Sequence, residues 1–276
     1  MIFAIIIDKV EVSFVQTVLI ILIKINMIKE PIKFYFDIEN EPPVVRTWRK
    51  YQQDVIWKER DGYIWSFSGC YNDGKIFHYC LADFPLYKKN PCSDEALAKK
   101  LFECFEKAEI VIAHNGNAFD IKHVNALFAK YNLGVPSPYK KIDTLLVARN
   151  EFYFWSNSLN DLAEYLGIGV KEETGGYGLW RKVEQGSKKS ISLMKKYNNH
   201  DVWLLREVYK KLRPYMHNHP NVGLFIGEKR ACRNCGSLKL QKRGISMRIN
   251  GAKWQKLQCQ GCGKWQEAPK EDAQVR

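Results

Sequence analysis

The chain has 276 residues, of which 43 are Lys or Arg and 30 are Asp or Glu, so its formal net charge is +13. Hydrophobic residues make up 46% and charged residues 26% of the chain. These proportions are typical of a packed globular protein and exclude a mainly disordered chain, a collagen and a multi-span membrane protein. The excess of basic residues favours a polyanionic partner, and nucleic acid is the first candidate.

The amino-terminal segment, residues 1–26, is hydrophobic, but its uncharged stretch at residues 12–23 is too short to span a bilayer. No small-residue cleavage site follows it, so we expect neither a removable signal peptide nor a membrane partner. Met27 precedes the first clear strand. The alternatives are a natural start at Met27, an extra element on the domain, or a weak membrane anchor, and we assign no function to this segment.

The first half of the chain predicts strands followed by alternating helices and strands. Residues 32–38 are rich in β-branched and aromatic side chains and predict a strand. Two more strands are expected at residues 63–69 and 75–81, joined by a turn at Asn72-Asp73-Gly74. Ser93 predicts the start of a helix, because Leu97, Leu101, Phe105 and Ala108 follow at helical spacing.

The pattern then changes to shorter elements and ends in a long helix. A buried strand is expected at residues 110–113 and helices at 119–130, around Leu159 to Leu166, and at 191–212. This order predicts an α/β fold, in which a mixed sheet has helices on both sides. Residues 217–229 have no periodicity and are predicted to be a linker.

The carboxyl-terminal part differs in charge and in cysteine pattern. From Glu228 onward, 12 Lys and Arg stand against 4 Asp and Glu. Cys232 with Cys235, and Cys259 with Cys262, form two Cys-x-x-Cys pairs separated by 23 residues, and each pair is followed by Gly. Four thiolates at this spacing predict a closed, structural zinc site in a reducing compartment, with a hairpin near Gly251 between the pairs. The widely spaced Cys70, Cys80, Cys92 and Cys104 are expected to be buried free thiols.

Acidic residues recur at three separate places. Asp37 and Glu39 end the first predicted strand and, two residues apart, point to the same face. Asp120 starts a helix after a turn-rich loop, and Tyr197 and Asp201 share a helix face. Carboxylates from separate elements suit divalent cations. Two such ions can stabilise the attacking and leaving oxygens of a phosphoryl displacement, with Tyr197 holding the attacking water.

The order of these motifs resembles the DEDD (DnaQ-like) superfamily of 3′→5′ exonucleases, which have a ribonuclease H-like fold. Phe-Asp-Ile-Glu at 36–39 resembles its first motif, Asn115 to Asp120 its second, and Tyr197 to Asp201 its third, of the tyrosine type. The resemblance implies a mixed five-stranded sheet, two Mg²⁺ or Mn²⁺ ions on Asp37, Glu39, Asp120 and Asp201, and a water-orienting Tyr197. It makes Asp143 structural or accessory.

The combination with a zinc ribbon is similar to a group of bacteriophage-encoded exonucleases. The sequence patterns themselves predict an exonuclease domain at residues 27–216, a linker at 217–229, a zinc ribbon at 230–268 and a tail at 269–276. The similarity implies a bacterial or phage-infected host cytoplasm. Because the scissile phosphate must reach the clustered carboxylates, we expect a single-stranded or frayed nucleic-acid substrate, with DNA favoured over RNA.

Contacts with nucleic acid are predicted where cations and aromatic side chains alternate. The residues predicted to make them are Arg46, Trp48, Lys242, Arg243, Trp254 and Lys256. Asn115 and Asn117, in the loop before Asp120, are predicted contacts as well. In the tail, the alternative is that Trp254 and Trp265 pack the ribbon while the lysines are solvated. Around Arg46 and Trp48, the alternative is that the side chains cover the sheet. For the chain as a whole, the alternatives are a non-catalytic nucleic-acid-binding or replication-accessory protein, and a proofreading subunit that needs a polymerase partner.

Overall fold

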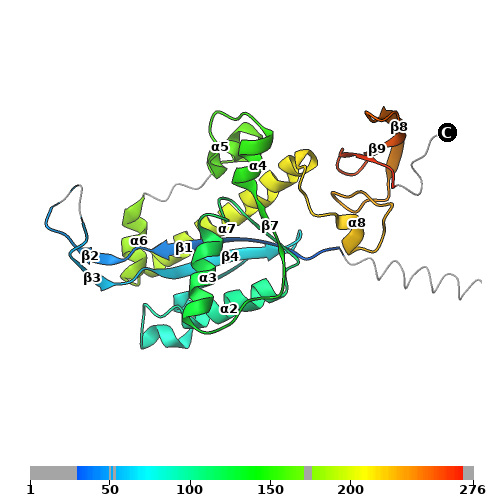
Figure 1. Cartoon of the computed structure of the whole chain (residues 1–276). Coiled ribbons are helices and arrows are strands. Elements are labelled where there is room, and N and C mark those ends of the chain that lie inside the picture. The colour runs from blue at the N-terminus through cyan, green and yellow to red at the C-terminus, as the bar shows by residue number, and fades with distance from the viewer. Residues whose placement is uncertain (1–29, 50, 52–53, 171–175, 270–276) are drawn as a thin grey trace, which may run out of the picture. The chain divides into compact units, whose positions relative to one another are not determined.

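The computed structural model describes residues 30–49, 51, 54–170 and 176–269, so the hypotheses for residues 1–26 lie outside the described part of the chain. Ile32–His217 form one compact unit, and the described residues from Asn218 onward belong to a second (Figure 1). Within these ranges, none of the helices has the length and apolar character that a bilayer crossing requires.

The first unit is built on a five-stranded mixed sheet with the order β5-β4-β1-β6-β7. The strands are β1 (Lys33–Glu41), β4 (Tyr63–Tyr71), β5 (Phe77–Cys80), β6 (Ile110–Ala113) and β7 (Lys140–Asp143). β1 is antiparallel to β4 and parallel to β6, which is parallel to β7. The carboxyl ends of β1, β6 and β7 therefore meet at one edge of the sheet.

Helices cover both faces of this sheet. The helices of the unit are α2 (Glu95–Glu106), α3 (Asp120–Lys130), α4 (Thr144–Glu151), α5 (Leu159–Tyr165), α6 (Tyr177–Glu184) and α7 (Lys188–Leu212). Phe34 and Phe36 of β1 pack with α2 and α3, whereas Tyr35 packs with α5 and α7. The predicted mixed five-stranded sheet flanked by helices is thus confirmed, and alternate residues of β1 face opposite layers.

Several local predictions hold and one is wrong. β1, β4 and β5 form the expected meander, and Asn72 adopts a left-handed conformation (φ 49°) in the predicted turn. The start of α2 is not capped by Ser93: its N-cap is Asp94. The Asp94 carboxylate instead accepts hydrogen bonds from Lys130 Nζ at 2.9 Å and the Tyr131 hydroxyl at 2.6 Å. The start of the helix is therefore determined by contacts with residues distant in the sequence, and not by the serine that the local sequence favours as its cap.

Other elements had no clear sequence signal. A separate two-stranded hairpin, β2 (Val44–Arg46) with β3 (Trp57–Arg60), follows β1. α4 and α6 were not expected either. The carboxyl-terminal unit contains a short helix, α8 (Val222–Phe225), and an antiparallel sheet of β8 (Leu240–Met247), β9 (Lys253–Cys259) and β10 (Trp265–Glu267).

α8 lies within the stretch predicted to be a linker. Val222 is buried, and its backbone N–H donates to Arg233 O at 2.7 Å. A Cβ atom added at Gly236 would lie 3.1 Å from Val222 Cγ1. The segment before the first cysteine pair therefore packs against that pair.

Candidate active site

Asp37 and Glu39 lie on one face of β1, next to the carboxyl end of the strand. Phe36 and Ile38 enter the core on the α2–α3 side, so the residues between them face the α7 side. The register between β1 and β4 shifts between Glu39 and Asn40, which marks a bulge at this point. Two carboxylates therefore project toward α7 where the regular strand is interrupted.

α7 brings the third carboxylate to this face. Asp201 is buried on α7, and its ligand oxygen lies within 4.8 Å of those of Asp37 and Glu39. Oxygens bound to one Mg²⁺ ion lie at most about 4.2 Å apart. Small side-chain movements would therefore bring all three onto a single ion. Tyr197, one turn before Asp201, is partly buried, with its ring 6.3 Å from that of Trp180.

The fourth predicted ligand lies beside this cluster without joining it. Asp120 is buried in the first turn of α3, and its Oδ1 accepts a hydrogen bond from Ile38 N at 3.4 Å. Burial raises the pKa of Asp120 to about 6. A cation near this carboxylate would lower that pKa again, because it favours the charged form.

The loop between β6 and α3 is held in place by Asp143. Its carboxylate accepts hydrogen bonds from Asn115 N at 2.9 Å and Asn117 N at 3.0 Å, and from Leu145 N at the start of α4. Asn115 has a left-handed φ of 63°. Asp143 thus has structural contacts, while Asn115 is exposed and Asn117 half-buried at the edge where β1 ends.

Asn198 is a residue of the site that motif reasoning missed. It is fully buried, and its Nδ2 donates a hydrogen bond to Asp37 Oδ2 at 2.6 Å. Its position three residues before Asp201 places it on the same helix face, which was a usable signal. Asn198 therefore restrains one of the clustered carboxylates.

A second set of polar contacts continues from α7 into the sheet. Ser68 Oγ donates to Asn199 Oδ1 at 2.8 Å and lies 2.9 Å from His78 Nδ1. Burial lowers the pKa of His78 to about 4. His78 is thus a neutral, buried histidine at neutral pH, and nothing local in the sequence indicated its connection to α7.

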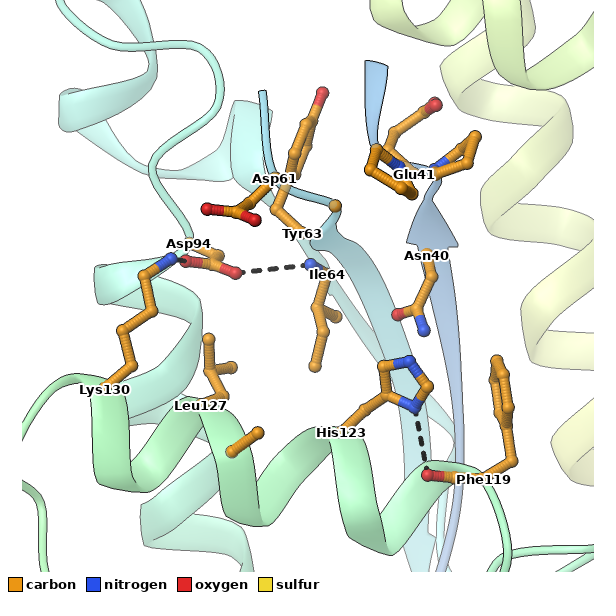
Figure 2. A pocket seen from close by; sticks show the side chains of 14 residues that line it. Asn40, Glu41, Asp61, Tyr63, Ile64, Asp94, Phe119, His123, Leu127 and Lys130 are labelled. Carbon is orange, nitrogen blue, oxygen red and sulfur yellow. Dashed lines mark hydrogen bonds and ion pairs between the residues drawn. The ribbon is translucent and has the colours of Figure 1, made fainter. Parts of the chain in front are cut away.

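A cavity of about 610 Å³ opens next to the predicted motifs. Figure 2 shows Asn40, which follows Glu39, and Phe119, which precedes Asp120, on its wall. His123 Nδ1 donates to Phe119 O at 3.1 Å, and their rings lie 4.4 Å apart. Glu41 also lines the cavity, and burial, together with Glu184, raises its pKa to about 7.

The remaining predicted contact residues lie elsewhere. Arg46 and Trp48 belong to the β2–β3 hairpin and the segment that follows β2, where Arg46 Nε pairs with Glu59 and Trp48 is 87% exposed. Lys242, Arg243, Trp254 and Lys256 belong to the other compact unit. Lys242, Arg243 and Lys256 are exposed and Trp254 is half-buried.

The four predicted zinc ligands converge within the carboxyl-terminal unit. Their Sγ atoms lie within 4.8 Å of one another, with Cys232 to Cys262 at 3.7 Å and Cys235 to Cys259 at 3.6 Å. Thiolates bound tetrahedrally at 2.3 Å would lie about 3.8 Å apart. The glycine after each pair has φ 76°, and its N–H donates to the first cysteine's carbonyl at 2.8 or 2.9 Å. The cluster therefore fits a tetrahedral metal ion.

Comparison with known proteins gives one family match. The model of the RNase_H superfamily matches residues 57–213, a range that includes Asp120, Tyr197 and Asp201 and begins after Asp37 and Glu39. Among solved structures, the chain is similar to the family B DNA polymerase from the hyperthermophilic archaeon Pyrobaculum calidifontis, at 13% identity and a TM-score of 0.45. That similarity covers 82% of this chain and 32% of the polymerase chain. No curated protein matches.

Proposed function

The chain belongs to the RNase H superfamily, and from this premise we propose that it is a metal-dependent 3′→5′ exonuclease that releases nucleoside 5′-monophosphates. Membership of the superfamily supports nuclease activity in general. One observation carries the finer proposal: the ligand oxygens of Asp37, Glu39 and Asp201 lie within 4.8 Å of one another, although the residues come from a strand and a distant helix.

The donor set fits the cations that the proposal requires. Carboxylate oxygens are the ligands that Mg²⁺ and Mn²⁺ prefer. Asp37, Glu39 and Asp201 would hold these ions, with Asp120 next to them on α3. When bound, two ions stabilise the attacking and leaving oxygens of an in-line displacement.

The chain's own residues would position the reactants. The Tyr197 hydroxyl orients a water molecule toward the scissile phosphorus, and Asn198 holds Asp37 in its orientation. Attack by the water breaks the bond between phosphorus and the 3′ oxygen of the preceding nucleotide. The products are a nucleoside 5′-monophosphate and a chain that is one nucleotide shorter, with a new 3′-hydroxyl.

The proposed substrate is a single-stranded or frayed 3′ end, because the scissile phosphate must reach carboxylates that are half-buried or buried. Asn40 and Phe119, the neighbours of Glu39 and Asp120 in the chain, line the cavity of Figure 2, which we propose receives the terminal nucleotide. DNA is the favoured substrate and RNA the alternative. A replication or polymerase partner is compatible with this activity.

The carboxyl-terminal unit is proposed to be a zinc ribbon. Cys232, Cys235, Cys259 and Cys262 provide four sulfur donors, as a structural zinc site requires. Asn234 Nδ2 lies 3.6 Å from Cys262 Sγ, and Gly261 N donates to Cys259 Sγ at 3.3 Å. Such N–H groups stabilise thiolates around a metal.

The test is cleavage by the full chain of 5′-labelled single-stranded DNA and RNA, with Mg²⁺, Mn²⁺ or no divalent ion. We expect a metal-dependent ladder that shortens from the 3′ end. An Asp37→Asn/Glu39→Gln variant, which removes two charges while keeping the side-chain volumes, should give no ladder. Binding without shortening on either substrate, at any metal concentration, would instead support the non-catalytic nucleic-acid-binding alternative.

A further inference from the structure

The two tryptophans of the carboxyl-terminal sheet have different surroundings. Trp254 is half-buried, and the Arg248 guanidinium lies 4.3 Å from the centre of its ring. Arg248 in turn pairs with Glu267 at 2.6 Å. One face of the Trp254 ring is therefore already occupied by a side chain that is held in place.

Trp265 lies on β10 and is 50% exposed. It pairs with Gln258 of β9, and its neighbour on the same face, Glu267, pairs with Lys256. Residues paired directly across an antiparallel sheet share a face. Trp265 and Lys256 therefore project from the same face of the sheet, whereas Lys253 of β9 projects from the other face.

A groove of about 470 Å³ lies on this face. The residues that line it are Arg243, Ser246, Lys256, Trp265, Gln266 and Glu267. Arg243 and Lys256 are exposed. Glu267, the acidic residue of the groove, accepts hydrogen bonds from Arg248 and Ser246. The bond from Arg248 is the main cause of the lowered pKa of Glu267. The groove thus combines an available aromatic ring with two cations.

We propose that this groove binds single-stranded nucleic acid, with Trp265 as the stacking platform for one unpaired base and with Arg243 and Lys256 contacting the flanking phosphates. Proteins that bind single strands combine a positively charged groove with aromatic side chains on which bases stack, and this groove offers both. A paired base does not offer its face for stacking, so the groove discriminates against duplex. The inference rests on the proposed function for its choice of ligand class, and it gives Trp254 a packing role.

The test uses the full chain with the Asp37→Asn substitution, so that substrate is not consumed, and fluorescein-labelled single-stranded oligo-dT and oligo-U as probes. Trp265→Ala should weaken binding by at least about fivefold, and Trp265→Phe should restore most of the affinity. Trp254→Phe, the matched control, should bind as the parent does. A similar loss on both probes identifies recognition through base and phosphate, and a loss confined to one identifies the preferred sugar.

The contribution of phosphate contacts to binding is tested with two lysines of β9 that project from opposite faces of the sheet. Lys256→Ala should lower the slope of log affinity against log salt by about 1, because one phosphate contact is lost. Lys253→Ala, on the opposite face, should leave the slope unchanged. Metal content and far-UV circular dichroism of each variant establish that the ribbon remains folded.

Two results would overturn the inference: unchanged affinity in a folded Trp265→Ala variant, or equal effects of the Lys256 and Lys253 substitutions. Cleavage by the chain with native Asp37 is measured separately. Binding that depends on Trp265, without any cleavage, would support the groove as a binding site and contradict the exonuclease proposal. Cleavage together with binding that does not depend on Trp265 would support the exonuclease and contradict the groove.

Discussion

The carboxylate cluster and the cysteine cluster each could hold metal, but the fold supports them differently. Asp201 lies more than 160 residues after Asp37 and Glu39 in the chain, and the three are positioned by a sheet and a helix with an extensive core. The four cysteines lie within a 31-residue span, in a unit whose sheet strands are mostly exposed or half-buried. The first site is built by folding of the domain, whereas the second would stabilise its unit by binding metal.

The largest effect should follow from loss of one cysteine. Cys259→Ser should release the metal and unfold the carboxyl-terminal unit, because structural zinc contributes about 10 to 16 kcal/mol to folding in small zinc modules. The melting transition of Ile32–His217 should remain. Metal analysis and limited proteolysis measure the two effects. Cys92→Ser, a change of the same chemistry outside the cluster, should keep both metal and fold, and metal retention in Cys259→Ser would contradict the assignment.

The second-largest effect should be a loss of activity without a loss of stability. Asp37→Asn should lower the cleavage rate by at least about a thousandfold, because metal-ion catalysis contributes several kcal/mol to the transition state. Its melting temperature should stay the same or rise, since repulsion from Glu39 and Asp201 is relieved. Glu103→Gln, which removes a surface carboxylate paired with Lys100, should leave the rate unchanged. An Asp37→Asn variant that unfolds, or that cleaves at the parent rate, would argue against a preformed site.

A smaller effect should come from the residue that holds Asp37. Asn198→Ala removes the 2.6 Å hydrogen bond to Asp37 Oδ2 and should lower metal affinity or activity by about 10- to 100-fold, as loss of a bond to a metal ligand does. A positioning role requires that high Mg²⁺ concentrations restore part of the rate. Asn199→Ala is the control, since Asn199 bonds Ser68 instead. An equal loss in both variants, insensitive to Mg²⁺, would indicate a purely structural role for Asn198.

The sequence predicted those parts of the site that depend on short spacings. Asp37 and Glu39 are two residues apart on a strand, Tyr197 and Asp201 are one turn apart on a helix, and the cysteine pairs specify their own turns. Contacts across the sheet were not predictable, because they depend on strand register. His78 meets Ser68 through the β4–β5 pairing. Similarly, the helix expected to be capped by Ser93 begins at Asp94, whose carboxylate is bound by Lys130 and Tyr131 of a distant segment.

The same reasoning explains the incomplete prediction of Asp120. Its place at the start of a helix was readable from the loop before it, but the distance from its carboxylate to the others depends on how α3 packs on β1. The β2–β3 hairpin lacked a signal for a related reason: its side chains are mostly exposed, so no alternation between buried and polar residues marks its strands.

The smallest effect distinguishes the two units by their response to acid. The pKa of His78 is lowered from 6.5 to about 4, mainly by burial and secondly by Lys195. Between these values the unfolded chain binds a proton that the folded chain does not, so stability is full above pH 6.5 and falls until about pH 4. Between pH 7.5 and pH 5 the loss from this group is about 2 kcal/mol.

His78→Gln should remove this pH dependence from the unit Ile32–His217, because glutamine does not titrate, although it should lower stability at pH 7.5 through imperfect packing. Urea unfolding at pH 7.5 and pH 5 measures the stability at pH 7.5 and its loss on acidification. The carboxyl-terminal unit should lose its proposed metal in acid through protonation of the cysteine thiolates, and His78→Gln should not change that loss. If the unit Ile32–His217 loses the same stability between pH 7.5 and pH 5 with and without His78, other groups cause that loss. That result would also leave the Ser68–His78 contact as packing alone.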